Sequence, residues 1–315
     1  MGNAVTTLTE LTCAAPAKLN LFLHIIGRRA DGYHLLQTVF RFIDLSDTLH
    51  FVLRNDGVVH RVSTLEGVPP EQDLCVRAAR LLQNECGCRL GVDITLQKRI
   101  PLGGGLGGGS SDAATTLLAL NCLWNLGLSR ARLMQLGLSL GADVPVFLFG
   151  ENALASGVGE QLQAYPLLDA QPQAKSEVWY LVLFPPVHVA TAKIFAHWDA
   201  EHPEMTRPEL TPDAISLRIR GLSFQAPGND QLPSNDQLLG NDLQPVVCGL
   251  YPEVSQHLVW LEQFSTARMT GSGACVFAEF ADFEQAQSVL SKLPPTMRGV
   301  VTRGLAHHPL LNFAV

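Results

Sequence analysis

Apolar residues alternate with other residues over the first fifty positions of the chain. Within residues 19–25 an apolar side chain recurs at every second position, which is the period of a strand with one buried face. An Asp-Gly turn interrupts the pattern within residues 27–34, and the alternation resumes over residues 36–45 and 48–53. The opening of the chain therefore predicts a set of antiparallel strands.

Helical and strand patterns alternate over the rest of the chain. Helices are predicted over residues 73–85, 111–125, 129–140, 210–220, 242–264 and 281–292. Strands are predicted over residues 92–98, 145–150, 153–159, 178–184, 267–270, 274–280 and 297–303. Ser129 is the expected N-cap of its helix. This mixture predicts an α+β protein whose second half is an antiparallel sheet backed by helices.

A polar, proline-containing segment at residues 165–177 is the candidate domain boundary. With 315 residues, the chain is long enough for two domains, and we expect them to span residues 1–165 and 166–315. Residues 199–241 are rich in Pro, Asn, Asp and Gln. We interpret them as a long surface insertion that contains one short helix.

Composition excludes several classes of protein. The formal net charge of −7 argues against a nucleic-acid-binding protein, which normally carries a basic surface. No apolar stretch reaches the length of a membrane span, and the N-terminus lacks the pattern of a signal peptide. Of the seven cysteines, only Cys86 and Cys88 lie close together, which predicts reduced thiols and no metal cluster. We expect a cytoplasmic protein without nucleic-acid or membrane partners.

A glycine-rich loop lies between the strand at 92–98 and the helix that follows. Six of the seven residues 103–109 are glycine, although ordering glycine costs more conformational entropy than ordering any other residue. Unshielded backbone amides can approach an anion closely, and a helix N-terminus adds positive potential. The loop therefore predicts a phosphate-binding site.

Three nucleotide-binding patterns fit this loop to different degrees. A Walker loop requires a lysine where this chain has Gly109. The glycines match a dinucleotide fingerprint, but no acidic residue occurs between Asp112 and Asp143 to hold a ribose. The interpretation that remains is a helix N-terminus at Ser110–Asp112 that holds phosphates without a lysine. A flexible linker is disfavoured, because Leu106 interrupts the glycines and a helix follows.

Polar residues stand in apolar surroundings at three further places. Lys18 and Asn20 are two positions apart on a predicted strand, so both can project into one cleft, or the lysine can protect a sheet edge. Asp143 precedes a proline, which suits a turn or helix cap as well as a functional carboxylate. The glycine turn at 271–273 is either an ordinary hairpin turn or a second wall that faces the first loop.

Four motifs in this order resemble the GHMP kinase superfamily. They are PAKLNLFL at 16–23, PLGGGLGGGSS at 101–111, GADVP at 141–145 and GSGA at 271–274. Further short matches, DGYH at 31–34 among them, make the chain similar to the branch that phosphorylates a cytidyl-erythritol alcohol in the non-mevalonate isoprenoid pathway. The resemblance covers nearly the whole chain and is weakest near residues 199–240.

The resemblance implies an α+β, two-domain GHMP kinase fold. Its N-terminal domain would be ribosomal-protein-S5-like and its C-terminal domain ferredoxin-like, with both substrates in the cleft between them. It implies an ATP-dependent kinase in which Asp143 accepts the proton of the attacking 2-hydroxyl and Lys18 orients Asp143 and offsets charge. The ATP-binding residues would be Pro101, Leu102, Gly103, Gly104, Gly105, Leu106, Gly107, Gly108, Gly109, Ser110 and Ser111. The residues that bind the cytidyl substrate would be Asn20, Tyr33, His34, Thr191 and Phe195.

The resemblance also sets expectations about ligands and leaves alternatives open. Mg²⁺ normally accompanies ATP-dependent phosphoryl transfer, but no residue is assigned to it. We expect a monomer or weak homodimer. Asp112 is acceptable as a helix N-cap, but it has to point away from phosphates. A kinase acting on homoserine, mevalonate or a sugar remains an alternative, as does a nucleotide-binding protein without catalysis, although an exposed Tyr33 beside the turn suits a nucleobase.

Overall fold

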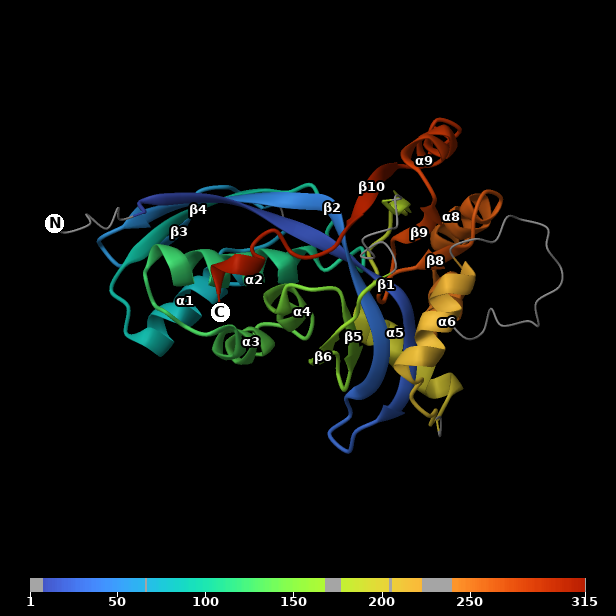
Figure 1. Ribbon diagram of the computed structural model, residues 1–315, viewed down its shortest axis with the longest axis horizontal. Helices are drawn as coiled ribbons and strands as arrows, with labels where there is room; N and C mark the ends of the chain where they lie inside the picture. Colours follow the sequence, from blue (N-terminus) through green and yellow to red (C-terminus); the bar gives the residue numbers. More distant parts are fainter. Residues whose placement is uncertain (1–7, 66, 168–176, 204–205, 223–239, 315) are drawn as a thin grey trace.

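Two long antiparallel strands run through the molecule. The computed structural model describes residues 8–65, 67–167, 177–203, 206–222 and 240–314. Strand β1 (Glu10–Arg28) pairs with β2 (His34–Arg54) along almost its whole length, and both strands extend through the two halves of the molecule (Figure 1). The strands expected at 36–45 and 48–53 form the single strand β2, because residues 46 and 47 stay paired with residues 16 and 15 of β1.

The N-terminal half is a sheet with helices on one face. Its other strands are β3 (Val59–Arg61), β4 (Gly91–Gln97), β5 (Ala153–Ser156) and β6 (Gln161–Ala164). Helices α1 (Leu74–Cys86), α2 (Gly108–Leu123), α3 (Arg130–Leu138) and α4 (Val144–Phe149) lie below this sheet (Figure 1). Helix α2 packs against β1, β2, α1 and α4. It is the central helix of this half, because nearly all of its side chains are buried.

The C-terminal half is an antiparallel sheet with its own helices. Its strands are β7 (Trp179–Leu183), β8 (Ala267–Met269), β9 (Val276–Phe280) and β10 (Gly299–Leu305), in the spatial order β10-β7-β9-β8. Its helices are α5 (Thr191–Glu201), α6 (Pro212–Leu222), α7 (Gln244–Leu250), α8 (Pro252–Glu262) and α9 (Phe283–Leu290). The expected α+β class is confirmed.

Strand β10 joins the two halves into one continuous sheet. It pairs with β7 on one side and with β2 on the other. After β10 the chain returns to the N-terminal half and ends beside α2 with the short 3₁₀ helix Leu311–Phe313 (Figure 1). The side chain of Leu310 is buried in the core of the N-terminal half. The last residues therefore fasten the C-terminal half to the N-terminal half.

Two predicted elements in the middle of the chain are wrong in type or extent. Residues 145–150 were expected as a strand, but they form α4. A short apolar run does not distinguish a buried strand from a buried helix, and here Pro145 occupies the first turn of the helix, where proline is favoured. The strand expected at 153–159 ends at Ser156, because Gly157 and Gly159 both have positive φ.

Two other helix boundaries differ from the expectation. Helix α2 begins at Gly108, with Gly107 at the N-cap position, so Ser110–Asp112 do not open it and Asp112 is not a cap. The helix expected over 242–264 is divided at Tyr251 into α7 and α8, because proline at 252 suits a helix start and not an interior.

The Ser129 cap is confirmed, since its side chain accepts a hydrogen bond from the Arg132 amide. Strands β3 and β6 were not predicted, because each is only three or four residues long.

Two expectations fall partly outside the described residues. The candidate boundary at 165–177 and the insertion at 199–241 both include undescribed positions, so the division of the chain after residue 165 stays a prediction. Helix α6 lies close to the expected 210–220. Within the described ranges, no helix is both long enough and apolar enough to cross a membrane.

Asn152 holds the junction where the C-terminal tail meets the N-terminal sheet. Its Oδ1 accepts a hydrogen bond from the Phe42 amide at 2.9 Å, and its Nδ2 donates to the carbonyls of Leu305 and Ala306 at 2.9 and 3.0 Å. The residue is buried. A single amide side chain thus satisfies three backbone groups of β2 and of the chain that follows β10.

We expect Asn152→Ala to lower the free energy of unfolding by about 2 kcal/mol or more, because a buried amide donor and two carbonyls lose their partner. Urea denaturation followed by circular dichroism measures this change. Gln163→Ala, at an exposed position of β6, is the control and should change stability by less than about 0.5 kcal/mol. Equal stability of the two variants would contradict the role given to Asn152.

Candidate active site

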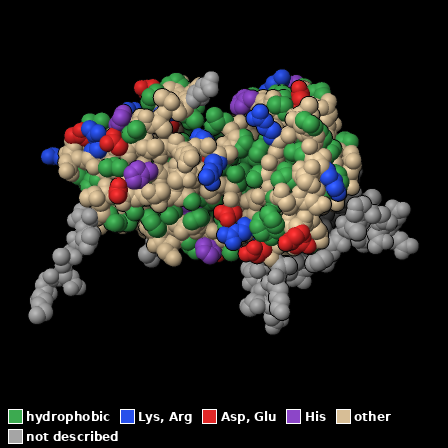
Figure 2. Space-filling view, turned by 90° about the horizontal axis from the view of Figure 1, so that it is seen from above, with side chains coloured by type: hydrophobic (Ala, Val, Ile, Leu, Met, Phe, Trp, Pro, Cys, Tyr) green, Lys and Arg blue, Asp and Glu red, His purple; other side chains and the backbone are tan. Residues whose placement is uncertain are grey.

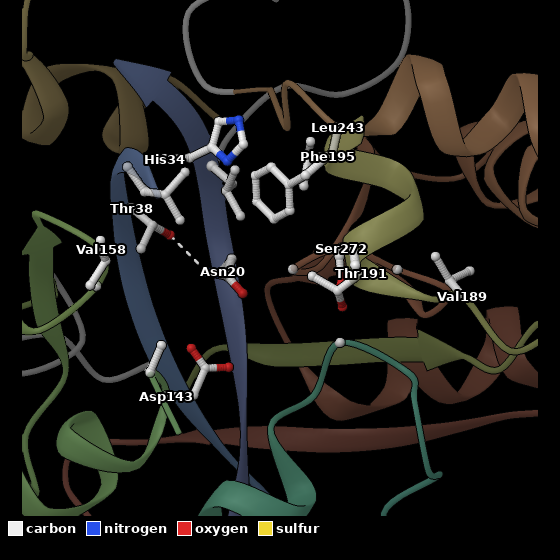
Figure 3. A pocket seen from close by; sticks show the side chains of 18 of the residues that line it. Asn20, His34, Thr38, Asp143, Val158, Val189, Thr191, Phe195, Leu243 and Ser272 are labelled. Atoms are coloured by element: carbon white, nitrogen blue, oxygen red, sulfur yellow. Dashed lines mark hydrogen bonds between the residues drawn. The ribbon is translucent and has the colours of Figure 1, made fainter. Parts of the chain in front are cut away.

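A cleft of about 950 Å³ lies where the two halves meet. Its walls come from β1 and β2, the glycine loop, the start of α4, the start of α5 and the turn at 271–273 (Figure 3). Most of the residues expected at the site line it. They are Lys18, Asn20, Tyr33, His34, Gly103, Gly105, Ser110, Asp143, Thr191 and Phe195. The fold therefore brings together residues that are as far as 177 positions apart in the sequence.

Lys18 is a buried cation in the floor of the cleft. Its side chain is only 2% exposed, and its Nζ lies 2.6 Å from Asn20 Oδ1, 2.9 Å from the Gly105 carbonyl oxygen and 3.4 Å from Asp143 Oδ2. Its backbone amide also donates to the carbonyl of Leu106. The alternative of an outward lysine protecting a sheet edge is therefore wrong. Lys18 joins strand β1, the glycine loop and the carboxylate.

Asn20 connects Lys18 to both halves of the molecule. Its Nδ2 donates to Thr38 Oγ1 at 3.0 Å on β2, which is the dashed line in Figure 3. Its backbone amide donates to Thr270 Oγ1 at 2.9 Å in the C-terminal half. Because its Oδ1 accepts from the Lys18 ammonium, the side chain of Asn20 has its polar atoms satisfied by protein groups. This network fixes the direction of the Lys18 side chain.

Asp143 stands at the N-cap position of α4 and yet makes no side-chain cap hydrogen bond. Its carboxylate points toward the cleft (Figure 3) and its side chain is 38% exposed. Asp143 therefore occupies the backbone position of a cap aspartate, but its side chain does not act as a cap. A carboxylate that is open to the cleft and 3.4 Å from a buried ammonium is held in one place and stays accessible to a ligand.

The glycine loop is packed too closely to carry side chains. Gly103, Gly105 and Gly107 have φ values of 67°, 75° and 72°, which disfavour other residues. A Cβ on Gly105 would lie 2.2 Å from the Thr270 carbonyl oxygen, and one on Gly103 would lie 2.2 Å from His188 Nδ1. Close approach of the C-terminal half is therefore one reason for the glycines, in addition to any contact with an anion.

Only part of the expected phosphate loop faces the cleft. Gly103, Gly105 and Ser110 line it, whereas the Leu106 side chain is buried in the apolar core between the halves. Ser111 is buried and Leu102 is exposed. The Leu106 side chain therefore anchors the loop in this core, whereas Leu102 does not.

The second glycine turn forms the opposite wall of the cleft. The amide of Cys275, just after this turn, donates to the Gly104 carbonyl at 3.1 Å. Thr191 Oγ1 lies 2.7 Å from Ser272 Oγ, and both side chains lie together in Figure 3. The turn connects β8 to β9 and also touches the first loop. Residues 271–273 are therefore both a hairpin turn and a second wall that faces the glycine loop.

An aromatic group occupies the far end of the cleft. The His34 ring stacks on Phe195 with centroids 4.4 Å apart and 23° between the planes (Figure 3). His34 Nε2 also lies 2.6 Å from Asp199 Oδ1. Tyr33 lines the cleft and is 65% exposed. One face of Phe195 is thus covered by His34, and an arrangement with a base between Tyr33 and Phe195 stays a prediction.

Asp199, Thr38 and His188 are among the lining residues that were not identified from the sequence. Asp199 lies one helical turn after Phe195, and that i, i+4 spacing on α5 is the signal that could have found it. Thr38 is adjacent to Asn20 only through the pairing of β1 with β2. His188 contacts Gly103 across the two halves, and no local pattern indicates this contact.

Charged side chains of both signs line the cleft. Figure 2 shows cationic and anionic side chains interspersed over one face of the molecule. Among the described residues, no group of three or more His, Cys, Asp or Glu side chains could hold a metal ion. Asp112 does not line the cleft and forms an ion pair with Lys98 at 2.8 Å, so it points away from the cleft, as expected.

Two family models match the chain. The model described as "GHMP kinases N terminal domain" matches residues 73–151, which include the glycine loop and Asp143, and "GHMP kinases C terminal" matches residues 229–298. Both lie in the order that the motifs predicted.

Full-length relatives and a solved structure give the same result. The chain is 55% identical over 313 residues to 4-diphosphocytidyl-2-C-methyl-D-erythritol kinase of Nitrosospira multiformis, covering 98% of this chain and 96% of the relative. It is 56% identical over 299 residues to the kinase of that name from Thiobacillus denitrificans, covering 95% and 97% of the two chains. The crystal structure of a 4-(cytidine 5'-diphospho)-2C-methyl-D-erythritol kinase matches with a TM-score of 0.74 and 34% identity, covering 93% and 99%.

A more distant structure bears on the fold alone. A homoserine kinase from Cytophaga hutchinsonii matches with a TM-score of 0.65 at 15% identity, covering 98% of each chain. Together with the family models, the matches confirm the two-domain GHMP kinase fold, with its ribosomal-protein-S5-like N-terminal and ferredoxin-like C-terminal domains. The identities and coverage of the full-length relatives show that this chain belongs to the 4-diphosphocytidyl-2-C-methyl-D-erythritol kinases of the GHMP kinase superfamily.

Proposed function

We propose that this chain uses ATP to phosphorylate the 2-hydroxyl of 4-diphosphocytidyl-2-C-methyl-D-erythritol, a step in isoprenoid precursor synthesis by the non-mevalonate pathway. The observation that carries the proposal is the Lys18–Asp143 pair, 3.4 Å apart, beside the carbonyl of Gly105 in the glycine loop. A base, a cation and a phosphate-binding loop thus meet at one point of a cleft that is large enough for a nucleotide and a second ligand.

The glycine loop and the start of α2 bind the triphosphate in this proposal. The first amides of a helix have no partners within the helix, and they point toward an anion together with the positive end of the helix dipole. Gly107 at the N-cap position and Gly108 in the first turn leave these amides unshielded by side chains. Backbone amides therefore perform the work that a lysine performs in a Walker loop.

Asp143 and Lys18 act on the attacking hydroxyl. Phosphoryl transfer depends mainly on alignment of the reactants and neutralisation of charge. Asp143 accepts the proton of the 2-hydroxyl as that oxygen attacks phosphorus. The Lys18 ammonium keeps the carboxylate in position and offsets the negative charge that shifts onto the transferred oxygens. Neither group has to move far, because Asn20 and Gly105 already hold the ammonium.

The cytidine binds at the aromatic end of the cleft in this proposal. Tyr33 and Phe195 provide aromatic faces, and backbone groups of His34 read the edge of the base by its donor and acceptor pattern. Thr191 and Asn20 lie between this end and Asp143 (Figure 3), where they can contact the rest of the substrate. The aromatic end is suited to a nucleobase because stacking on each ring contributes about 1–3 kcal/mol.

Mg²⁺ accompanies the ATP phosphates in this proposal, and we assign it no protein ligand. Mg²⁺ keeps several water molecules and binds substrate phosphates with only one or two protein carboxylates, so it does not need a preformed cluster. When bound, it neutralises charge on the phosphates. A cytoplasmic location and a monomeric or weakly dimeric state stay predictions.

We expect Asp143→Asn to lower kcat by at least about a hundredfold while ATP binding is retained, since a positioned base contributes about that much. Lys18→Met should lower kcat as well. Steady-state kinetics with ATP and the cytidyl substrate measure both losses, and the double variant should lose less than the product of the two, because the groups act as a unit. Independent, multiplicative losses would contradict a direct partnership.

We expect Gly107→Ala to weaken ATP binding by at least about tenfold, because a Cβ would lie 2.9 Å from Phe147 and 3.1 Å from Lys18 Cε and would shift the loop. Gly127→Ala is the matched control. Gly127 has a similar φ of 66°, but a Cβ there would meet no atom within 4 Å, so it shares the backbone strain without the contact. Isothermal titration with ATP distinguishes the two, and equal affinities would exclude the glycine loop as the ATP site.

We expect Tyr33→Ala and Phe195→Ala to raise KM for the cytidyl substrate by about tenfold or more, while KM for ATP stays nearly constant, because each removes a stacking contact. Phe283→Ala is the control, since Phe283 is an exposed aromatic of α9 whose ring packs on Trp179 and does not line the cleft. If Phe195→Ala lowers the melting temperature and leaves both KM values unchanged, Phe195 is a core residue and does not bind the base.

A further inference from the structure

A buried ion cluster lies behind the glycine loop. The Lys98 ammonium, just after β4, forms ion pairs with Asp47 of β2 and with Asp112 of α2, the latter at 2.8 Å. Asp47 Oδ1 accepts hydrogen bonds from the backbone amides of Arg99 and Ile100, the second at 2.9 Å. We call Asp47, Lys98 and Asp112 the loop cluster.

The loop cluster holds the glycine loop at both of its ends. Asp47 fixes the backbone at residues 99 and 100, immediately before the loop. Lys98 Nζ lies 3.1 Å from the position that a Cβ on Gly108 would take, at the first residue of α2. Asp112 is the fifth residue of the same helix. The conformation of the loop is therefore tied to the charges in this cluster.

The charges of the loop cluster do not balance when both carboxylates are ionised. One ammonium faces two carboxylates, and both aspartates are buried. Within the described residues, Asp112 Oδ1 has no hydrogen-bond partner. Burial raises the pKa of Asp112 to about 7, with Lys98 acting to lower it and Asp47 to raise it. Burial also opposes the ammonium form of Lys98, but Asp112 and Asp47 together raise the pKa of Lys98.

Other charged groups near Asp112 come from α1 and β3. Asp73 of the α1 cap is paired with Arg61 at 2.7 Å, so its charge is compensated. The Cys75 thiol is fully buried, and burial together with Asp112 and Asp73 raises its pKa well above the usual value, so it stays neutral. Asp112 is therefore the group of this region whose charge changes near neutral pH.

We propose that Asp112 is a positioning residue whose protonation controls how well the glycine loop binds the triphosphate of ATP. With a proton on Asp112 the loop cluster is neutral overall. When Asp112 ionises, it adds one negative charge behind the amides of the first turn of α2 and alters its hold on Lys98. Asp112 does not touch the nucleotide, and the inference rests on the proposed binding of ATP at this loop.

The sign of the effect follows from the raised pKa. The protonated carboxyl is favoured in the folded protein, so its contribution to stability is present below the ordinary carboxyl pKa and is lost as the pH rises through about 7. Stability is therefore lost between the ordinary carboxyl pKa and about 7. ATP affinity should decline as Asp112 itself ionises near pH 7, because the added negative charge repels the phosphates.

We expect Asp112→Asn to remove this part of the pH dependence. Isothermal titration with ATP between pH 6 and pH 8.5 should give similar affinities for both proteins at pH 6. At pH 8.5 the dissociation constant of the unmodified protein should exceed that of the variant by roughly threefold or more. Asp93→Asn is the control, since Asp93 is also ion-paired, with Arg54, but lies near the start of β4, at the end opposite the glycine loop. Asp93→Asn should leave the pH dependence of ATP affinity unchanged. Protonation of ATP itself affects all the proteins equally, so it cancels when their affinities are compared at one pH.

Urea denaturation without nucleotide supplies an independent measurement. From pH 5 to pH 8.5, the stability of Asp112→Asn should rise relative to that of the unmodified protein. If the variant and the unmodified protein show parallel pH profiles in both experiments, the proposal is overturned. An Asn variant that does not fold would also overturn it, because the folded protein would then not accept a neutral side chain at position 112. If the unmodified protein binds no ATP at any pH, the proposed function fails, whereas the denaturation result still decides the protonation of Asp112.

Discussion

The Lys18 ammonium is buried between the two halves of the molecule, and a buried charge is tolerated only with partners that replace water. Asn20, the Gly105 carbonyl and the Asp143 carboxylate are those partners. They come from β1, the glycine loop and the start of α4, so satisfying one ammonium brings three segments into register. The same requirement puts Asp143 at the cleft, since its carboxylate is the one full negative charge among these partners.

Close approach of backbone to backbone is the second constraint on the site. The glycine loop and the turn at 271–273 meet at distances that leave no space for a Cβ on Gly105. The conformational entropy lost by ordering these glycines is offset by contacts across the halves, such as the hydrogen bond from Cys275 to Gly104. Contacts within the protein thus hold the loop in this conformation, and a preformed loop loses less entropy on binding a ligand.

The ion pairs on the two sides of the glycine loop differ in their exposure and in their balance of charge. On the cleft side, one cation and one accessible carboxylate face each other. Behind the loop, Lys98 lies between two buried carboxylates, where low polarity makes every charge costly unless it is matched. The ion pair that faces the cleft and the ion pairs that hold the backbone of the loop are therefore separate sets, on the two sides of the first turn of α2.

The sequence by itself determined the α+β class, the antiparallel strands at the N-terminus and the glycine loop, because period-two alternation and dense glycine are local signals. The other residues expected at the cleft came from motifs that resemble those of GHMP kinases. The sequence also indicated that Lys18 and Asn20 share one side of a strand. Only the tertiary structure decided that residues 145–150 are a helix, that Asp112 pairs with Lys98, and that His34 stacks on Phe195. Each of these depends on contacts between segments distant in sequence, whose energies no local pattern contains.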